Sequence, residues 1–384
     1  MDAYDIKYEP GVIRPALSAR GYSEQEQEEW ENDLTNGQNE DPWLALLIPL
    51  LPNLQCLTMT FENPSTHVRK VLKRALGGQW PLDSQPLAYL REISVQVTDC
   101  ELEYYGVPTS DALLFFGFPS IQSFRAECIA DCDEDEYCSP ETLCGFSTIT
   151  NIDLRKGNSK SGMQRLIRAC AKLESFRYEH EITIGPCDDF NPAAFHASLL
   201  HHKDTLQRLT LVFNKEEDYR PGQGGEDNFF GSLSQFTALR EICLRAPNLL
   251  DLGGEAGYIQ TRLVDMLPSS LQRLAIEDFH QCDMNVLTAE LEDCVLNMTS
   301  RFPCLHTLQI GGYIHEYDPV SADLTPPGRI HIPCIAQEVI QITQRLQFLC
   351  QAVGVKLRLW SREIEDAIAH KKEIEEEGED YELG

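Results

Sequence analysis

The sequence predicts an α/β fold, a right-handed solenoid in which short parallel strands form the inner layer and helices form the outer layer. Two observations support this. A six-residue pattern, apolar–x–x–apolar–x–apolar, recurs nine times at intervals of 24 to 36 residues, and helix-like segments lie between many of the copies. A single strand of this kind cannot bury its apolar face, so stacked neighbours must supply a continuous core.

The copies share their apolar spacing and, in many cases, a lead-in such as "FPSIQ" or "LPSSLQ". The second and third apolar residues are two apart, as on the buried face of a strand, and the first turns the chain into that strand. The nine copies are "LQCLTM" at Leu54, "LREISV" at Leu90, "IQSFRA" at Ile121, "ITNIDL" at Ile149, "LESFRY" at Leu173, "LQRLTL" at Leu206, "LREICL" at Leu239, "LQRLAI" at Leu271 and "LHTLQI" at Leu305, and "VKLRLW" near Leu357 is a candidate tenth.

The segments between the strands have helical periodicity. "HVRKVLKRAL" (67–76) places Val68, Val71, Leu72, Ala75 and Leu76 on one face. An ordinary doubly wound α/β domain is the alternative, and nine copies of one pattern favour the solenoid. Further helices are predicted within residues 162–171, 190–202, 259–267, 284–298 and 335–354.

Charge and composition predict three segments. Residues 1–50 form an acidic N-terminal segment and a helical cap, residues 51–360 the solenoid, and residues 361–384 an acidic tail. Residues 1–41 contain 11 acids and 3 bases, and residues 361–384 contain 10 acids and 3 bases. Blocks of this sort are typical of solvated tails.

The helical cap carries its own signals. Ser23 and Glu26 have the spacing of a capping box, and Asp41-Pro42 is predicted to supply an N-cap and a first-turn proline. Trp30, Leu34 and Trp43 are then expected to cover the open end of the first repeat.

Global charge limits the class of partner. The net charge of −29 argues against nucleic acid and against an anionic membrane surface, because both need clustered Lys and Arg. The start has no secretory signal, and the longest apolar run, "WLALLIPLLPNL", is 12 residues, too short to span a bilayer. The 14 cysteines are therefore expected to be reduced thiols of a cytoplasmic or nuclear protein.

The run "ALSARGYSEQEQEEWENDLTNGQNEDPWLALLIPLLPNLQCLTM" (16–59), followed by the repeats, resembles the region after the F-box in large fungal F-box proteins with irregular leucine-rich-repeat-like solenoids. The resemblance implies a substrate receptor of a cullin-type ubiquitin ligase, with the repeats holding the substrate. Residues 1–41 are too short and too acidic for an F-box. The cullin-ligase adaptor is therefore expected as a partner only if an F-box exists upstream, and both truncation and a relative without an F-box stay open.

No enzyme motif is complete. "GNSKSG" (157–162) lacks the spacing of a nucleophile elbow, and "RPGQGGEDN" (220–228) lacks the Lys-Ser/Thr of a phosphate loop. The histidines of "FHASLLHH" with Cys187 lack metal-ligand spacing. We expect no catalytic residue, metal or cofactor; the alternative is a hydrolase or metal-dependent enzyme with a site on rim loops.

The stretch "AECIADCDEDEYCSPETLC" (126–144) invites a metal-site interpretation. Asp131, Asp133 and Asp135 match positions 1, 3 and 5 of an EF-hand loop, but position 6 is Glu136 instead of glycine and position 12 is a threonine. Its cysteines lack the two-residue knuckle of structural zinc. An acidic rim loop in a reduced compartment is the preferred interpretation, and metal binding there stays open.

The repeat register predicts where a protein partner docks. Residues before, between and after the last two apolar positions of each copy face the inner curve, and their charge alternates from strand to strand. They are expected to form a self-neutralising ladder, a polar docking surface for a protein partner of a monomeric chain, or both. A scaffold without a ligase link is the other functional reading. The predicted positions are Arg125, Asp153, Arg155, Arg177, Glu179, Arg208, Glu241, Arg245, Arg273 and Glu277.

Overall fold

The computed structural model covers the whole chain. The residues that it describes are 10–36, 40–61, 66–79, 86–97, 106–130, 144–181, 190–213, 229–250, 252–253, 258–280, 284–316, 333–361, 364 and 367–368.

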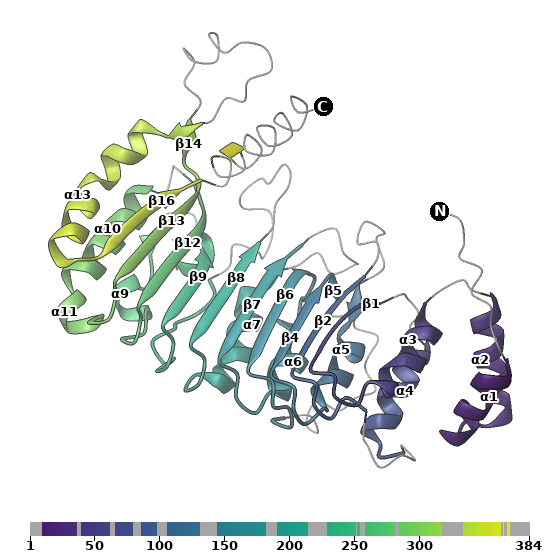
Figure 1. Cartoon of the computed structure of the whole chain (residues 1–384). Coiled ribbons are helices and arrows are strands. Elements are labelled where there is room, and N and C mark those ends of the chain that lie inside the picture. The colour runs from purple at the N-terminus through teal and green to yellow at the C-terminus, as the bar shows by residue number, and fades with distance from the viewer. Residues whose placement is uncertain are drawn as a thin grey trace, which may run out of the picture. The chain divides into compact units, whose positions relative to one another are not determined.

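All ten copies of the pattern form strands. The strands are β1 (Cys56–Phe61), β2 (Glu92–Val97), β4 (Ser123–Glu127), β6 (Asn151–Gly157), β7 (Ser175–His180), β8 (Arg208–Phe213), β9 (Glu241–Arg245), β12 (Arg273–His280), β13 (Thr307–Tyr313) and β16 (Lys356–Trp360). They form one ten-stranded sheet in the order in which they occur along the chain. Each pair for which the register is resolved is parallel. Strand and helix alternate, so the predicted α/β solenoid-like arrangement is confirmed (Figure 1).

The chain divides into two compact units. The first unit contains residues Met1–Leu173 and His180–Asp188, and the second contains residues Glu174–Glu179 and Asp189–Gly384. Each unit is described separately below.

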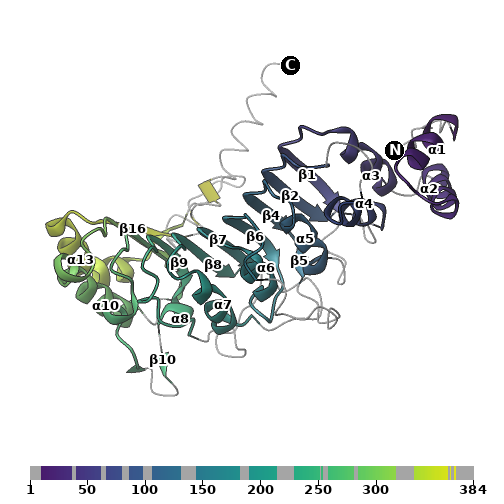
Figure 2. The ribbon, with the colours of Figure 1, turned by 90° about the horizontal axis from the view of Figure 1, so that it is seen from below.

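The first unit packs helices against one face of its strands. The helices α4 (Thr66–Leu76), α5 (Thr109–Phe116) and α6 (Gln164–Ala169) run along that face (Figures 1 and 2). Four of the five residues predicted for the apolar face of α4 are buried, and Leu76 is half-buried. A short parallel pair, β3 (Val107–Pro108) with β5 (Ile129–Ala130), adds to this unit and was not predicted. The helices are α1 (Pro10–Ala19), α2 (Glu24–Asn36), α3 (Asp41–Leu47), the 3₁₀ turn η1 (Ile48–Leu50), α4 (Thr66–Leu76), α5 (Thr109–Phe116) and α6 (Gln164–Ala169).

The capping box before α2 is confirmed. The backbone N–H of Ser23 donates to Glu26 Oε2 at 2.8 Å, and the N–H of Glu26 donates to Ser23 Oγ at 3.3 Å. These hydrogen bonds satisfy two donors that a helix start leaves open. The hydrogen bond from the Ser23 N–H also lowers the pKa of Glu26, because it favours the ionised carboxylate.

Asp41 has a different role from the predicted one. It is the first residue of α3, whose N-cap is Glu40. Its carboxylate instead accepts the N–H groups of His67 (2.6 Å) and Val68 (3.2 Å), at the start of α4. The prediction of an N-cap for its own helix was wrong, because the sequence does not reveal that a second helix start lies within reach.

In the second unit, too, helices pack against one face of the strands. The helix predicted within residues 259–267 is only one turn long, α9 (Leu263–Met266), because Tyr258–Ile259 form β11, which pairs antiparallel with β10 (Leu252–Gly253). A second antiparallel pair is β14 (His315–Glu316) with β15 (Cys334–Ile335). The other helices are α7 (Pro192–Leu199), the 3₁₀ turn η4 (Leu200–His202), α8 (Ala246–Leu249), α10 (Met284–Leu296), α11 (Met298–Arg301) and α13 (Gln337–Val353).

The apolar positions of the pattern form the core in both units. Leu90, Ile121 and Ile149 in the first unit, and Leu206 and Leu239 in the second, have no exposed surface. In these copies the first residue of the pattern is therefore buried beneath the strand that follows it, whereas Leu54 in the first copy is half-buried. No helix within the described residues is long and apolar enough to cross a membrane.

The expectation that every cysteine is a free thiol is wrong at one position. Cys128, which directly follows the strand β4 and has no exposed surface, is disulfide-bonded. Its partner lies outside the described residues, as do Asp131–Thr142 of the acidic stretch. The other described cysteines are not disulfide-bonded.

Candidate functional site

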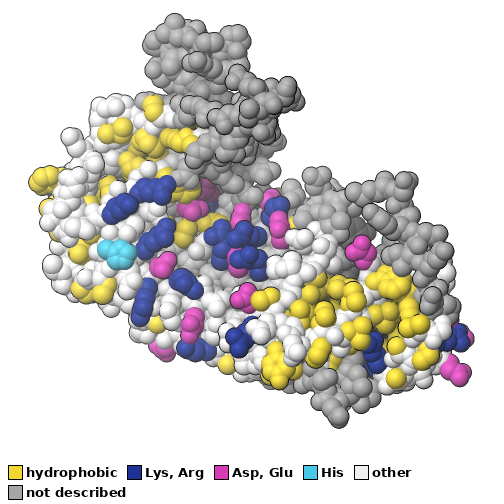
Figure 3. All heavy atoms as spheres, viewed as in Figure 1, with side chains coloured by type: hydrophobic (Ala, Val, Ile, Leu, Met, Phe, Trp, Pro, Cys, Tyr) yellow, Lys and Arg dark blue, Asp and Glu magenta, His cyan; other side chains and the backbone are white. Residues whose placement is uncertain are grey.

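The candidate site lies on the open face of the sheet, which we define in each unit as the face opposite the helices. Strand alternation sets this face: in β4 the apolar Phe124 and Ala126 are buried, whereas Arg125 between them is exposed. The register predicted from the sequence is confirmed here. Figure 3 shows this face, with Lys and Arg side chains gathered over the strands of the second unit.

In the first unit the open-face charges neutralise one another. Arg125 and Asp153 are register partners on β4 and β6, and Arg125 Nε lies 3.2 Å from Asp153 Oδ2. Arg155, two residues along β6, reaches the same oxygen at 3.4 Å. The predicted lateral pair is therefore present, and one carboxylate serves two guanidinium groups.

The neighbouring pair in this unit differs from the prediction. Glu127 and Arg155 are opposite each other in register. However, Glu127 pairs with Lys156, whose Nζ lies 3.0 Å away. Lys156 has a positive φ of 47°, and this turn at the end of β6 brings its side chain to Glu127.

In the second unit the ladder is incomplete. Arg177 and Glu179 pair along β7 at 3.6 Å. Glu241 on β9 lies between Arg208 and Arg273 in register. Among the residues that the structure describes, however, Glu241 forms no ion pair with either arginine. The lateral ion pairs predicted at these positions are therefore not formed.

Arg208 and Arg273 are oriented by neutral partners instead. Arg208 Nε donates to Ser175 Oγ at 3.4 Å. Arg273 Nε donates to the side-chain oxygen of Gln309 at 3.0 Å, and its Nη2 contacts the same oxygen. A neutral amide orients a guanidinium without cancelling its charge.

Arg245 is the exception among the predicted open-face residues. Its side chain is 2% exposed and its Nε lies 2.7 Å from Asp278 Oδ2. Its guanidinium also lies over the ring of Phe213, 5.0 Å from the centroid. Its register partner Glu277 instead accepts a hydrogen bond from the thiol of Cys243 at 3.2 Å. Arg245 is therefore part of the core and is not accessible to a partner.

The thiol of Cys243 does not provide a nucleophile. Burial and the adjacent carboxylate of Glu277 both raise its pKa, so the thiol stays protonated at neutral pH. In its hydrogen bond to Glu277 the thiol of Cys243 is the donor, which requires that it be protonated.

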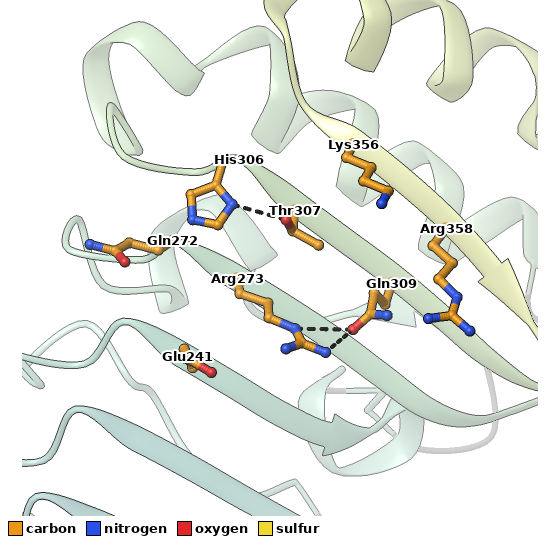
Figure 4. A pocket seen from close by; sticks show the side chains of 8 residues that line it. All are labelled: Glu241, Gln272, Arg273, His306, Thr307, Gln309, Lys356 and Arg358. Atoms are coloured by element: carbon orange, nitrogen blue, oxygen red, sulfur yellow. Dashed lines mark hydrogen bonds between the residues drawn. The ribbon is translucent and has the colours of Figure 1, made fainter.

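A depression of about 340 Å³ opens at the β9–β16 part of this face. Figure 4 shows its side chains extending from β9, β12, β13 and β16, and from the turns that lead into β12 and β13. Three cations line it, with one histidine and one carboxylate, and most of its surface is polar. The lining residues are Glu241, Gln272, Arg273, His306, Thr307, Gln309, Lys356 and Arg358.

Six of these lining residues were missed in the sequence. Lys356 and Arg358 lie in the tenth copy, and Thr307 and Gln309 in the ninth, at the same two open-face positions of the pattern. Applying the same assignment of open-face positions to the last two strands would have predicted these four residues. Gln272 and His306 precede the strands, and the pattern assigns no face to such positions.

The histidines considered as metal ligands have other contacts. His196 Nε2 lies 2.9 Å from the carbonyl oxygen of Ser232, and its ring packs edge-on against Phe230. His201 Nδ1 lies 3.1 Å from the carbonyl of Ser198. Cys187 and the glycine-rich stretch 220–228 lie outside the described residues. Across the described ranges, no three His, Cys, Asp or Glu residues are arranged to hold a metal ion.

This repeat architecture and its open polar face agree with the comparison against protein families. The model for a leucine-rich repeat domain matches residues 102–313, more than half of the chain. The chain belongs to the leucine-rich repeat domain family. Such domains generally mediate protein–protein recognition and are typically non-catalytic binding modules. The comparisons with curated proteins and with solved structures each found no match.

Proposed function

We propose that this chain recognises a protein partner through the open face of its sheet. The observation that carries the proposal is the side-chain content of that face: charged and polar residues stand in rows over a sheet whose other face is packed with helices. A rigid sheet fixes the backbone positions of such rows, which lowers the ordering cost of binding, and Arg is the charged residue most enriched in binding hot spots.

The test is affinity capture from native extract, with the chain as bait and mass spectrometry as readout. Arg125→Glu combined with Arg177→Glu reverses charge on the open face of each unit, and both side chains are more than two-fifths exposed. We expect these substitutions to abolish capture of the specific partners. A matched bait with Lys70→Glu and Lys73→Glu, on α4, changes the same charge on a helix and should retain them.

Unchanged capture by the open-face variant would place the interface elsewhere. The reason is that charge reversal at a contacted Arg adds repulsion to the loss of its contacts, so an interface on this face could not remain at full strength. Circular dichroism on both baits is the check that neither variant has unfolded.

A finer role is proposed from the resemblance of residues 16–59 to the region after the F-box in fungal F-box proteins. In that role the chain is the substrate-receptor part of a cullin-type ubiquitin ligase. A capture that recovers the cullin-ligase adaptor supports it. Partners recovered without any adaptor favour a scaffold that has no ligase link.

A further inference from the structure

The open face of the second unit carries a cluster of positive side chains within a strongly acidic chain. The depression is lined by Arg273, Lys356 and Arg358 against one carboxylate, Glu241, while the whole chain has a net charge of −29. In the described part of the chain, Lys356 and Arg273 form no ion pair. The first unit differs, because there Asp153 and Glu127 pair with the cations around them.

The cations are held in a defined arrangement. Lys356 and Arg358 are two apart on β16 and therefore point to the same face. Arg273 is two strands away, on β12, and Gln309 on the intervening β13 orients its guanidinium. Figure 4 shows Arg273 directed toward Gln309, with Lys356 and Arg358 on its far side. At ~4.8 Å between neighbouring strands, the two groups of cations are about 10 Å apart.

This spacing fits an extended peptide. In the extended polyproline II conformation a peptide advances about 3.1 Å per residue with three residues per turn, so side chains three residues apart point to the same side and are separated by about 9 Å. A carboxylate at each of these positions would reach Arg273 and the Lys356–Arg358 pair. Arg pairs with carboxylates through two parallel N–H donors, which gives direction as well as charge.

Other ligand classes fit less well. Small-molecule pockets are mostly apolar and enclose their ligand, whereas this depression is polar and open. A nucleic acid would bring phosphates against the acidic surface of the rest of the chain. A short acidic segment presents its charge only where the cations are.

We propose that the depression formed by Arg273, Gln309, Lys356 and Arg358 binds an acidic peptide segment of a protein partner, with carboxylates three residues apart. This rests on the proposed function, because it names the partner chemistry for one part of the open face. Glu241, on β9 at the margin of the depression, repels an acidic ligand through its negative charge.

The experiment measures fluorescence anisotropy of a fluorescein-labelled ten-residue peptide with Glu at every third position and Ser or Gly between. The matched peptide carries Gln instead of Glu. We expect the full chain to bind the Glu peptide and not the Gln peptide. Arg273→Gln with Lys356→Gln and Arg358→Gln should weaken binding about tenfold or more, since each lost exposed ion pair costs a few-fold.

A matched control removes three cations from helices, away from the open face. Lys70→Gln and Lys73→Gln on α4 with Arg345→Gln on α13 cause the same change in net charge. We expect them to leave binding within about twofold, because short-range pairing dominates over screened long-range charge. Equal weakening in both variants would show attraction to overall charge and overturn the proposal.

A single substitution makes the test independent of whether the triple variant folds. Glu241→Gln removes the one carboxylate of the depression and should tighten Glu-peptide binding a few-fold, about the value of one exposed charge interaction. Unchanged or weaker binding in this variant contradicts the proposal.

The chain's own acidic tail is the competing occupant. Residues 373–384 carry seven acids and no base. If the wild-type chain binds no Glu peptide but a full-length variant with Glu375→Gln, Glu376→Gln, Glu377→Gln and Glu379→Gln does, the site belongs to the tail and the proposal fails. Absence of binding by both also overturns it.

The outcome is separable from that of the proposed function. Loss of partner capture in the Arg125→Glu and Arg177→Glu bait, together with no Glu-peptide binding, retains an open-face interface and rejects the acidic-peptide assignment. Unchanged capture in that bait rejects the interface regardless of the peptide result.

Discussion

Arg245 Nε and Asp278 Oδ2 lie 2.7 Å apart, with Arg245 2% and Asp278 13% exposed. A β-bulge in β12 brings these two side chains together. The register against β13 shifts between Ile276 and Phe279, and Asp278 has a φ of 57°. The extra residue turns the carboxylate of Asp278 toward Arg245, where regular alternation would have presented Glu277.

Loss of this pair should destabilise the fold. Asp278→Asn keeps the shape of the side chain and tolerates a positive φ, but leaves the guanidinium of Arg245 buried without its counter-charge. We expect the free energy of unfolding to fall by about 2 kcal/mol in urea titrations. Asp265→Asn is the control, since Asp265 pairs with Arg301 at the surface and should cost well under ~1 kcal/mol. Equal costs would mean that burial does not strengthen the Arg245 pair.

Gly311 on β13 is required by the ring of Trp360. The two residues are register partners, and a Cβ on Gly311 would overlap the indole. Gly311→Ala should displace the ring, shift tryptophan emission to longer wavelength and destabilise the chain by about 1–3 kcal/mol. In a Trp360→Ala background the same substitution should cost little, which a double-mutant cycle measures. An additive result in that cycle would contradict the contact.

Asp41 gives a pH dependence with a defined sign. Burial raises its pKa, and the nearby Asp33 adds to this, whereas the N–H groups of His67 and Val68 oppose it. The folded chain therefore holds the proton more tightly than the unfolded chain. The contribution of Asp41 to stability should be complete below about pH 4, the unfolded value, and should fall as pH rises through the raised pKa.

The measurement for Asp41 is the urea midpoint from pH 3.5 to 7 for the wild type and Asp41→Asn. We expect the midpoint of the wild type relative to the variant to decrease across this range. A constant difference, or one that increases with pH, would show that the N–H donors of α4 dominate and hold the carboxylate ionised.

Asp153 should contribute little to stability but much to local charge. It pairs with Arg125 and Arg155, whose side chains are about half exposed, so Asp153→Asn should lower the free energy of unfolding by less than ~1 kcal/mol. The same change leaves two guanidinium groups uncompensated on the open face. Weak binding of the Glu peptide to this unit should then appear by anisotropy in the variant carrying Asp153→Asn together with the Gln substitutions at Arg273, Lys356 and Arg358.

The strands could be predicted from the sequence because the hexamer pattern repeats a local rule: apolar residues two apart mark the buried face. All ten copies became strands. The pattern also gave the correct face for Arg125 and Arg273. Contacts that depend on one inserted residue or on a distant helix start, as at Asp278 and Asp41, could not be predicted, because no local pattern encodes them.

The site was predicted in part for a related reason. The alternation of side chains along each strand predicted the open face. Pairing between strands also depends on side-chain rotamers: Glu127 forms an ion pair with Lys156, and Arg273 donates a hydrogen bond to Gln309. The sequence therefore indicated a self-neutralising surface throughout. The structure shows ion pairs on the open face of the first unit, and three cations beside one carboxylate at the last strands of the second.

The opposite signs of this local surface and of the whole chain affect association kinetics. At low ionic strength an acidic partner meets a repulsive field at long range before it reaches Arg273 and Lys356, so encounter is slow. Salt shortens the Debye length to about 8 Å at 0.15 M and removes the distant repulsion first. The association rate should therefore increase with salt while the lifetime of the complex shortens, the reverse of electrostatic steering.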